Sequence, residues 1–152
     1  AEVARIERVV AELGLGERVH FVAPQPHHLL STYYRAADVA VVPSRSESFG
    51  LVALEAAACG IPVVAAAVGG LRTLIDDGVT GFLVDSREPS AFADRVDALL
   101  AAPDRAAEMG DAAASGAGRY AWSTTAGRLR RLYADLGVGA RPVLFCGAHG
   151  TT

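Results

Sequence analysis

Residues 38–66 read DVAVVPSRSESFGLVALEAAACGIPVVAA, and this stretch decides the fold. It predicts an apolar strand over 39–42, then a loop, a helix over 51–58 and a second apolar strand over 61–66. Both strands are continuous apolar runs instead of alternating patterns. Such runs are typical of a parallel sheet that helices cover on both faces. The stretch therefore indicates an α/β domain.

The rest of the chain continues this alternation of strands and helices. The last helix is expected to start at an N-cap at Ser123 and to turn Leu129, Leu132 and Leu136 towards the core. The predicted strands are 18–22, 39–42, 61–66 and 81–84, and the predicted helices are 1–13, 28–37, 51–58, 71–75, 89–102, 103–115 and one from 123 onwards.

This order of elements predicts a doubly wound, mostly parallel sheet. Ligands of such sheets bind at the carboxyl ends of the strands, and the loop over 43–50 lies at that edge. The chain opens directly on a helix, and about four strands are fewer than such sheets usually have. We therefore expect the domain to be incomplete at its amino-terminal end. An open sheet edge would favour self-association.

Composition excludes several classes of protein. The net charge is −3, and the 14 basic residues are all arginines scattered along the chain, which argues against a nucleic-acid surface. No apolar run is long enough to span a membrane, and no signal-peptide pattern opens the chain. Two cysteines are too few for a disulfide framework, so we expect a reduced, cytoplasmic setting. The histidines have no metal-type spacing, so no metal site is expected.

Two carboxylates, Glu47 and Glu55, flank the glycine-containing turn that opens the helix over 51–58. Backbone N–H groups at a helix start attract anions. An ionised carboxylate accepts hydrogen bonds from two hydroxyls. A diphosphate with a sugar at each end fits this order of groups, so the loop predicts a nucleotide-sugar site. Without its context, the same pair of acids would indicate only exposed helix ends.

The chain from Arg18 to about Val84 resembles the donor-binding domain of the retaining GT-B glycosyltransferases, the glycosyl transferase group 1 family with an E-x7-E motif. Within that family, residues 44–52 are most similar to the D-inositol-3-phosphate glycosyltransferases, and next to sucrose-phosphate synthase relatives. The resemblance implies that residues 1–140 form part of a Rossmann-like carboxy-terminal domain. The matching segments are YRAADV (34–39), PSRSESFGLV (43–52), EAAACGIPVVA (55–65), VGGL (68–71) and DGVTGFLV (77–84).

The resemblance also implies roles for individual residues. Glu47 would contact the donor sugar and act in catalysis, while Glu55 would accept both ribose hydroxyls. Backbone amides between the two acids would hold the sugar and the diphosphate, and Gln25 would line the uracil base. The expected donor-binding residues are therefore Glu47, Ser48, Phe49, Gly50, Leu51, Val52, Glu55 and Gln25.

The implied reaction moves a hexosyl or N-acetylglucosaminyl group from a nucleoside diphosphate sugar, preferably a UDP-sugar, to an acceptor hydroxyl with retention. Inositol phosphate is the favoured acceptor, and no cofactor is implied. The family's diphosphate clamp and its amino-terminal acceptor domain do not occur in this sequence, so the chain alone is expected to be inactive. The alternatives are UDP-glucose or GDP-mannose as donor, or a non-catalytic nucleotide-sugar-binding module.

Three further segments carry open interpretations. Gly69-Gly70 favours a close backbone approach to the ligand, with a plain turn as the alternative. Arg45 would either neutralise phosphate or face solvent. Residues 141–152 match nothing and stay unassigned. The glycines before Arg18 do not form a dinucleotide-binding loop, because they follow a helix and lack the third glycine.

Overall fold

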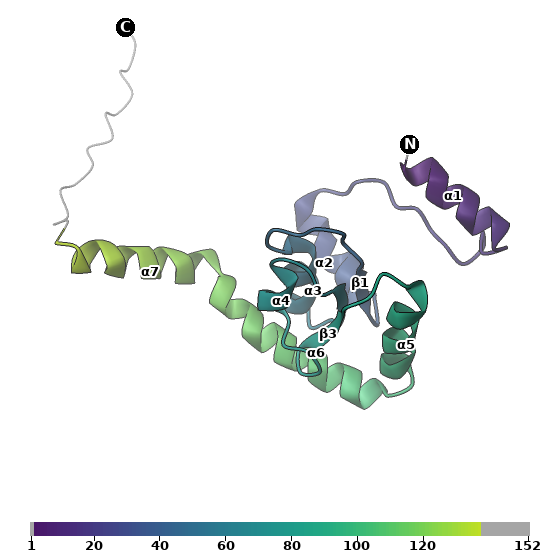
Figure 1. Cartoon of the computed structure of the whole chain (residues 1–152). Helices are drawn as coiled ribbons and strands as arrows, with labels where there is room; N and C mark the ends of the chain where they lie inside the picture. Colours follow the sequence, from purple (N-terminus) through teal and green to yellow (C-terminus); the bar gives the residue numbers. More distant parts are fainter. Residues whose placement is uncertain (1, 138–152) are drawn as a thin grey trace, which may run out of the picture.

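A computed structural model describes residues 2–137, so the unassigned tail over 141–152 lies outside the described residues. Three parallel strands form one sheet in the order β1-β2-β3 (Figure 1). The strands are β1 (Ala40–Val42), β2 (Val63–Ala66) and β3 (Gly81–Val84). The helices are α1 (Glu2–Glu12), α2 (His27–Arg35), α3 (Leu51–Ala58), α4 (Leu71–Leu74), α5 (Pro89–Leu100), α6 (Pro103–Ala117), the short 3-10 helix η1 (Gly118–Tyr120) and α7 (Trp122–Asp135).

Helices cover both faces of the sheet, as the apolar strands predicted. Val63 and Ala65 of β2 belong to a cluster formed with residues of α3 and α4, against which Tyr34 of α2 also packs. Val64 points to the opposite face, where it packs with Leu99 of α5 and residues of α6 and β3. Alternate residues of the central strand therefore enter two different cores. The fold is a doubly wound α/β sheet.

The prediction of a strand over 18–22 is wrong, so the sheet formed by residues 2–137 has three strands and not about four. This segment is irregular, and its apolar side chains stay exposed, with Phe21 at 47% and Val22 at 57%. A strand needs a hydrogen-bonded neighbour, and none of the described residues pairs with the segment. β1 lies at the edge of the sheet, and its Val41 is 47% exposed. An open edge of this kind can pair with another strand, and self-association through it stays a prediction.

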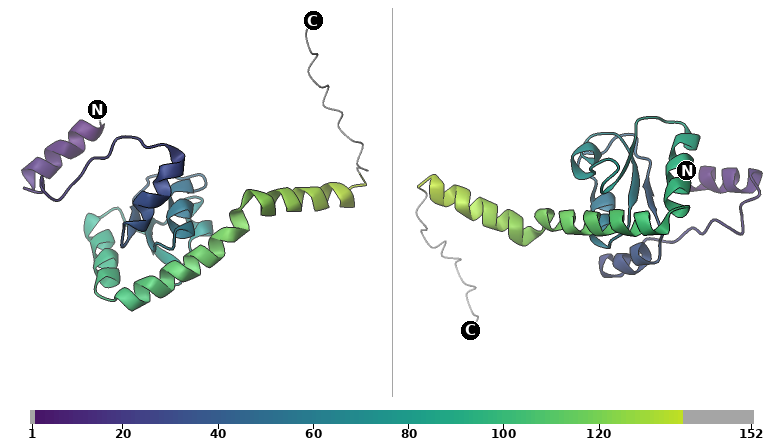
Figure 2. Two further views of the ribbon diagram at one scale, coloured as in Figure 1. Left: turned by 180° about the vertical axis from the view of Figure 1, so that it is seen from behind. Right: turned by 90° about the horizontal axis from the view of Figure 1, so that it is seen from below.

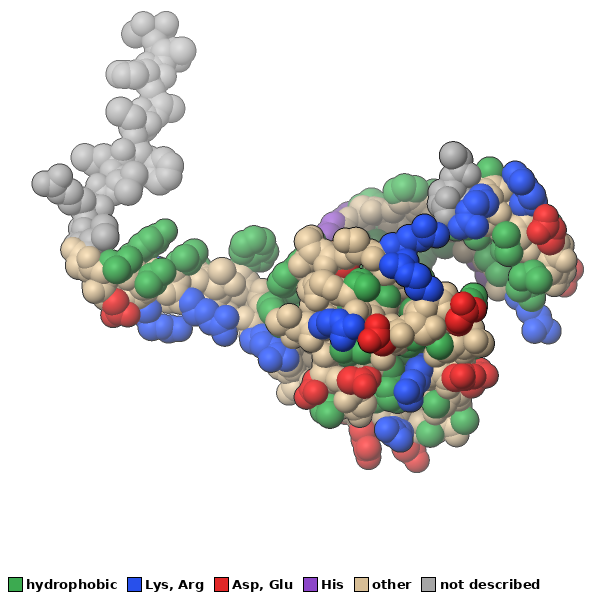
Figure 3. Space-filling view, in the orientation of Figure 1, with side chains coloured by type: hydrophobic (Ala, Val, Ile, Leu, Met, Phe, Trp, Pro, Cys, Tyr) green, Lys and Arg blue, Asp and Glu red, His purple; other side chains and the backbone are tan. Residues whose placement is uncertain are grey.

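The prediction for the last helix is wrong in two respects. α7 starts at Trp122 after Ala121 and has no side-chain cap, so Ser123 is not its N-cap. Leu129, Leu132 and Leu136 are 46%, 50% and 67% exposed, so they do not face the core. These leucines are exposed because α7 extends away from the sheet (Figure 2). Figure 3 shows its hydrophobic side chains as a stripe beside the arginines.

α1 also extends away from the sheet, at the other end of the molecule (Figure 2). Its apolar positions recur at helical spacing, yet Val3, Ile6 and Val9 are 40–57% exposed. The periodicity therefore predicted the helix correctly, although no core formed by the described residues covers its apolar face. Within residues 2–137, no helix combines the length and apolarity needed to cross a membrane.

Candidate donor-binding site

The loop between β1 and α3, residues 43–50, depends on a glycine at its end. Gly50 precedes the first turn of α3 with φ at +99°, a conformation that L side chains rarely adopt. A Cβ atom there would lie 2.8 Å from Cδ2 of Leu71, so the position also lacks space. No described side chain caps α3, which leaves its first-turn N–H groups available to a ligand.

Gly69 and Gly70 do allow a close backbone approach, but the structure corrects what they approach. The N–H of Gly70 donates to the carbonyl oxygen of Glu47 at 2.9 Å. A Cβ atom on Gly69 would overlap that carbonyl, and one on Gly70 would lie 2.5 Å from the carbonyl oxygen of Ser48. The two glycines therefore let the start of α4 support the loop over 43–50 from behind.

Glu47 lies in this loop, half-buried, and its carboxylate contacts the backbone of the same loop. Its Oε1 atom accepts a hydrogen bond from the N–H of Phe49 at 3.4 Å. Ser48, Phe49, Leu51 and Val52 are exposed around it. An acid and several accessible backbone groups therefore share one surface at the carboxyl end of β1, where sheets of this kind bind ligands.

Glu55 lies one turn further into α3, and two residues of α2 reach its carboxylate. The hydroxyl of Tyr34 donates to Oε2 at 3.0 Å, and Nε2 of His27 lies 3.3 Å from Oε1. Burial, and then the hydrogen bond to Glu55, raise the pKa of Tyr34 to about 12. Sequence reasoning missed both partners. The segment YRAADV did contain the signal, because a tyrosine that packs partly on a core needs a partner for its hydroxyl.

Gln25 lies in the loop before α2, and its side-chain amide donates to the carbonyl oxygen of Ala23 at 2.9 Å. It precedes His27 by two residues, so it belongs to the same end of α2 as that partner of Glu55. No contact in the described residues joins Gln25 to Glu55. Its role at the base therefore stays a prediction.

A groove of about 680 Å³ lies at the carboxyl edge of the sheet and includes both Ser44 and Arg45. The other lining residues come from the ends of β1, β2 and β3 and from the start of α5. Neither Glu47 nor Glu55 lines the groove. Arg45 is exposed beside it, so a role for this side chain at phosphate stays open.

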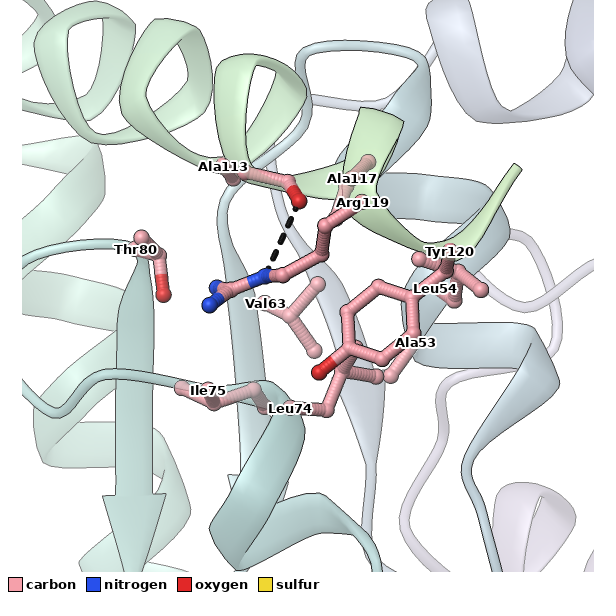
Figure 4. A pocket seen from close by; sticks show the side chains of 12 residues that line it. Ala53, Leu54, Val63, Leu74, Ile75, Thr80, Ala113, Ala117, Arg119 and Tyr120 are labelled. Atoms are coloured by element: carbon pink, nitrogen blue, oxygen red, sulfur yellow. Dashed lines mark hydrogen bonds between the residues drawn. The ribbon is translucent and has the colours of Figure 1, made fainter. Parts of the chain in front are cut away.

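The residues of η1, directly after α6, pack against α3 and against Phe49 of the loop over 43–50. Figure 4 shows Arg119 and Tyr120 over a void of only about 10 Å³ between α3 and the α6–η1 segment. Nε of Arg119 donates to the carbonyl oxygen of Gly116 at 3.1 Å. The ring of Tyr120 meets Phe49 edge-on, with the ring centres 5.6 Å apart. The void has no room for a donor, and the contact with Phe49 supports the loop from the carboxy-terminal side.

The sequence of this chain is similar to those of known proteins. The family described as glycosyl transferases group 1 matches residues 1–116. A D-inositol 3-phosphate glycosyltransferase of Frankia alni is 52% identical over 126 residues, which cover 83% of this chain. The chain spans only 31% of that relative's length.

Solved structures agree with this match. A sucrose-phosphate synthase from Thermosynechococcus elongatus superposes with a TM-score of 0.84 at 41% identity, over 91% of this chain and 35% of the other. The HepE protein of Anabaena, solved in complex with UDP-glucose, gives a TM-score of 0.80 at 27% identity, over 88% and 36%. The sheet and its helices therefore form the Rossmann-like carboxy-terminal domain of a GT-B fold, and the chain belongs to the glycosyl transferases group 1 family.

Proposed function

We propose that this chain binds the nucleotide-sugar donor of a retaining glycosyltransferase, with residues 1–140 as the donor-binding domain. One observation carries the proposal. Two half-buried carboxylates, Glu47 and Glu55, stand on either side of a helix start that no described side chain caps. Glu47 then binds hydroxyls of the transferred sugar, the N–H groups at the start of α3 bind the diphosphate, and Glu55 binds the ribose.

The electrostatics of the site agree with this division of the ligand. A helix N-terminus carries a partial positive charge, which stabilises a negative group beside it by ~0.3–1 kcal/mol at exposed sites. Of the donor's groups, the two carboxylates then contact only neutral hydroxyls, so neither has to lie against phosphate. As the sugar–phosphate bond breaks, charge grows on the leaving diphosphate next to these N–H groups, which stabilises the transition state.

We propose a UDP-sugar as the donor and a hexosyl or N-acetylglucosaminyl group as the transferred sugar. The HepE complex with UDP-glucose supports uridine, and the inositol-phosphate glycosyltransferase relatives support an inositol phosphate acceptor. In a front-face reaction the leaving diphosphate takes the proton of the acceptor hydroxyl while the sugar is transferred, which retains the anomeric configuration. We place this reaction in the cytoplasm, in keeping with the low cysteine content.

Ligand-observed NMR on the 152-residue chain tests the donor proposal. UDP should bind, GDP should bind more weakly, and NAD should not compete. Preferential binding of GDP would mean that the base of the donor is guanine and not uracil. Preferential binding of NAD would contradict the proposal that this loop binds a nucleotide sugar.

Glu55→Gln should weaken UDP binding more than tenfold, because a hydrogen bond to a charged group is worth ~1.5–3 kcal/mol. Glu108→Gln is the matched control, because Glu108 is exposed on α6 and is remote from the loop over 43–50 in sequence. Equal UDP affinity in both variants would remove Glu55 from the site.

A further inference from the structure

The carboxylate of Glu55 is held from outside its own helix. Glu55 lies on α3, and the side chain that reaches its Oε2 atom, Tyr34, lies 21 residues earlier on α2. The bond length of 3.0 Å is that of an ordinary hydrogen bond, and both groups are partly buried. A glutamate has three rotatable side-chain bonds, so a carboxylate without such a partner would lose more rotamer freedom when a ligand binds.

We propose that Tyr34 is a positioning residue that holds the carboxylate of Glu55 in the orientation that accepts the two ribose hydroxyls of the donor. This inference rests on the proposed function, in which Glu55 binds ribose. Tyr34 itself contacts Glu55 and not the reacting atoms.

Tyr34 is better suited to this role than His27, the other partner of the same carboxylate. The side chain of His27 is 86% exposed, and its Nε2 atom lies 3.3 Å from Oε1. Exposed pairs of this kind contribute little and give way easily. The ring of Tyr34 packs against the core cluster under α3, so its hydroxyl has a fixed position. A tyrosine hydroxyl is protonated, and therefore a donor, at neutral pH, and the raised pKa of Tyr34 extends this state to higher pH.

The carboxylate can serve Tyr34 and a ribose together. An ionised carboxylate offers about four acceptor sites on its two oxygens, and Tyr34 uses one of them on Oε2. Two ribose hydroxyls need two more. His27 can leave Oε1 without breaking any core contact, because its side chain is exposed. Tyr34 thus stays in place while the ribose hydroxyls take the position of His27.

The test compares UDP with 2′,3′-dideoxy-UDP, which lacks both hydroxyls that Glu55 would bind. The affinities are measured by ligand-observed NMR for the unmodified 152-residue chain and for Tyr34→Phe, Tyr33→Phe and Glu55→Gln. Tyr33→Phe is the matched control, because it removes a hydroxyl from the adjacent, 47% exposed tyrosine of α2. Tyr34→Phe keeps the ring that packs on the core, so the variant should stay folded.

We expect Tyr34→Phe to weaken UDP binding by about 3- to 10-fold, part of the ~10- to 100-fold that a charged hydrogen bond is worth, and to leave the affinity for 2′,3′-dideoxy-UDP unchanged. Tyr33→Phe should change neither. Adding Tyr34→Phe to Glu55→Gln should cause no further loss of UDP affinity, because the group that Tyr34 positions is then altered.

Two results would overturn the role of Tyr34 alone. In the first, Tyr34→Phe binds UDP as tightly as the unmodified chain does and keeps its full preference for UDP over 2′,3′-dideoxy-UDP. In the second, Tyr34→Phe lowers the affinity for both ligands equally, which would indicate a structural effect on α2. A different result would overturn the proposed function and this inference with it. In that case the unmodified chain would bind UDP no better than 2′,3′-dideoxy-UDP, and Glu55→Gln would bind UDP like the unmodified chain.

Discussion

Gly70→Ala should destabilise the loop that carries Glu47 without straining the backbone at position 70 itself. The backbone of Gly70 has φ −62° and ψ −22°, which alanine adopts freely. The added Cβ atom, however, would lie 2.5 Å from the carbonyl oxygen of Ser48 and 2.6 Å from both Cα and the carbonyl oxygen of Phe49. All three are backbone atoms, so no side-chain rotation can relieve the overlap.

The loss in the free energy of unfolding can be estimated from the distance by which the overlapping atoms must move apart. Restoring an ordinary contact of 3.4 Å requires the start of α4 and the loop to move apart by about 0.9 Å. That movement breaks the 2.9 Å hydrogen bond from Gly70 to Glu47, a loss of ~1 kcal/mol. Overpacking adds ~1–3 kcal/mol. The free energy of unfolding should therefore fall by ~2–4 kcal/mol, which lowers Tm by roughly 4–16 °C in a chain of this size.

Gly118→Ala is the control, because Gly118 has almost the same backbone angles, φ −57° and ψ −26°, with open space around it. It should be neutral, or stabilising by ~0.4–1 kcal/mol, since alanine restricts the unfolded chain. Urea unfolding measures both variants, and ligand-observed NMR should show weaker UDP binding only for Gly70→Ala. Equal free energies of unfolding in the two variants would refute the reasoning that α4 presses on the loop over 43–50.

Three further predictions follow from the site. Glu47→Ala should leave UDP affinity within about twofold but abolish any extra affinity for a UDP-sugar over UDP in NMR titrations; an equal loss for both ligands would contradict the division between Glu47 and Glu55. The raised pKa of Tyr34, about 12 against 10.0 for a free tyrosine, means that the folded state holds this proton more tightly. This stabilisation is full below pH 10 and is lost as the pH rises towards 12. The free energy of unfolding, measured with urea, should therefore fall more steeply over that range in the unmodified chain than in Tyr34→Phe; equal slopes against pH would contradict the raised pKa of Tyr34. Residues 1–152 alone should transfer no sugar in a radiolabelled-donor assay, because positioning of donor and acceptor, worth ~7–11 kcal/mol, is incomplete without an acceptor site; turnover by the purified chain would disprove this.

The order of the elements could be read from the sequence because each of its signals is local. The apolar runs at 39–42 and 81–84 correspond to β1 and β3, and the stop at Cys59-Gly60 ends α3 as expected. The strand predicted over 61–66 begins only at Val63, since Pro62 has no N–H for the ladder. The glycine-containing turn at the start of α3 was predicted in the same way, and the structure adds that Gly50 has a positive φ there.

The sequence by itself therefore determined the α/β order, the loop at the carboxyl end of β1, and the two acids that flank a helix start. Only the tertiary structure decided what each segment contacts. Among residues 2–137, the segment over 18–22 has strand composition but no strand beside it, and the leucines of α7 have helical spacing but no surface that covers them. Gly70 and Tyr34 have partners 23 and 21 residues away, at Glu47 and Glu55. Periodicity reports the conformation of a segment, whereas a partner distant in the chain is fixed only when the elements pack together.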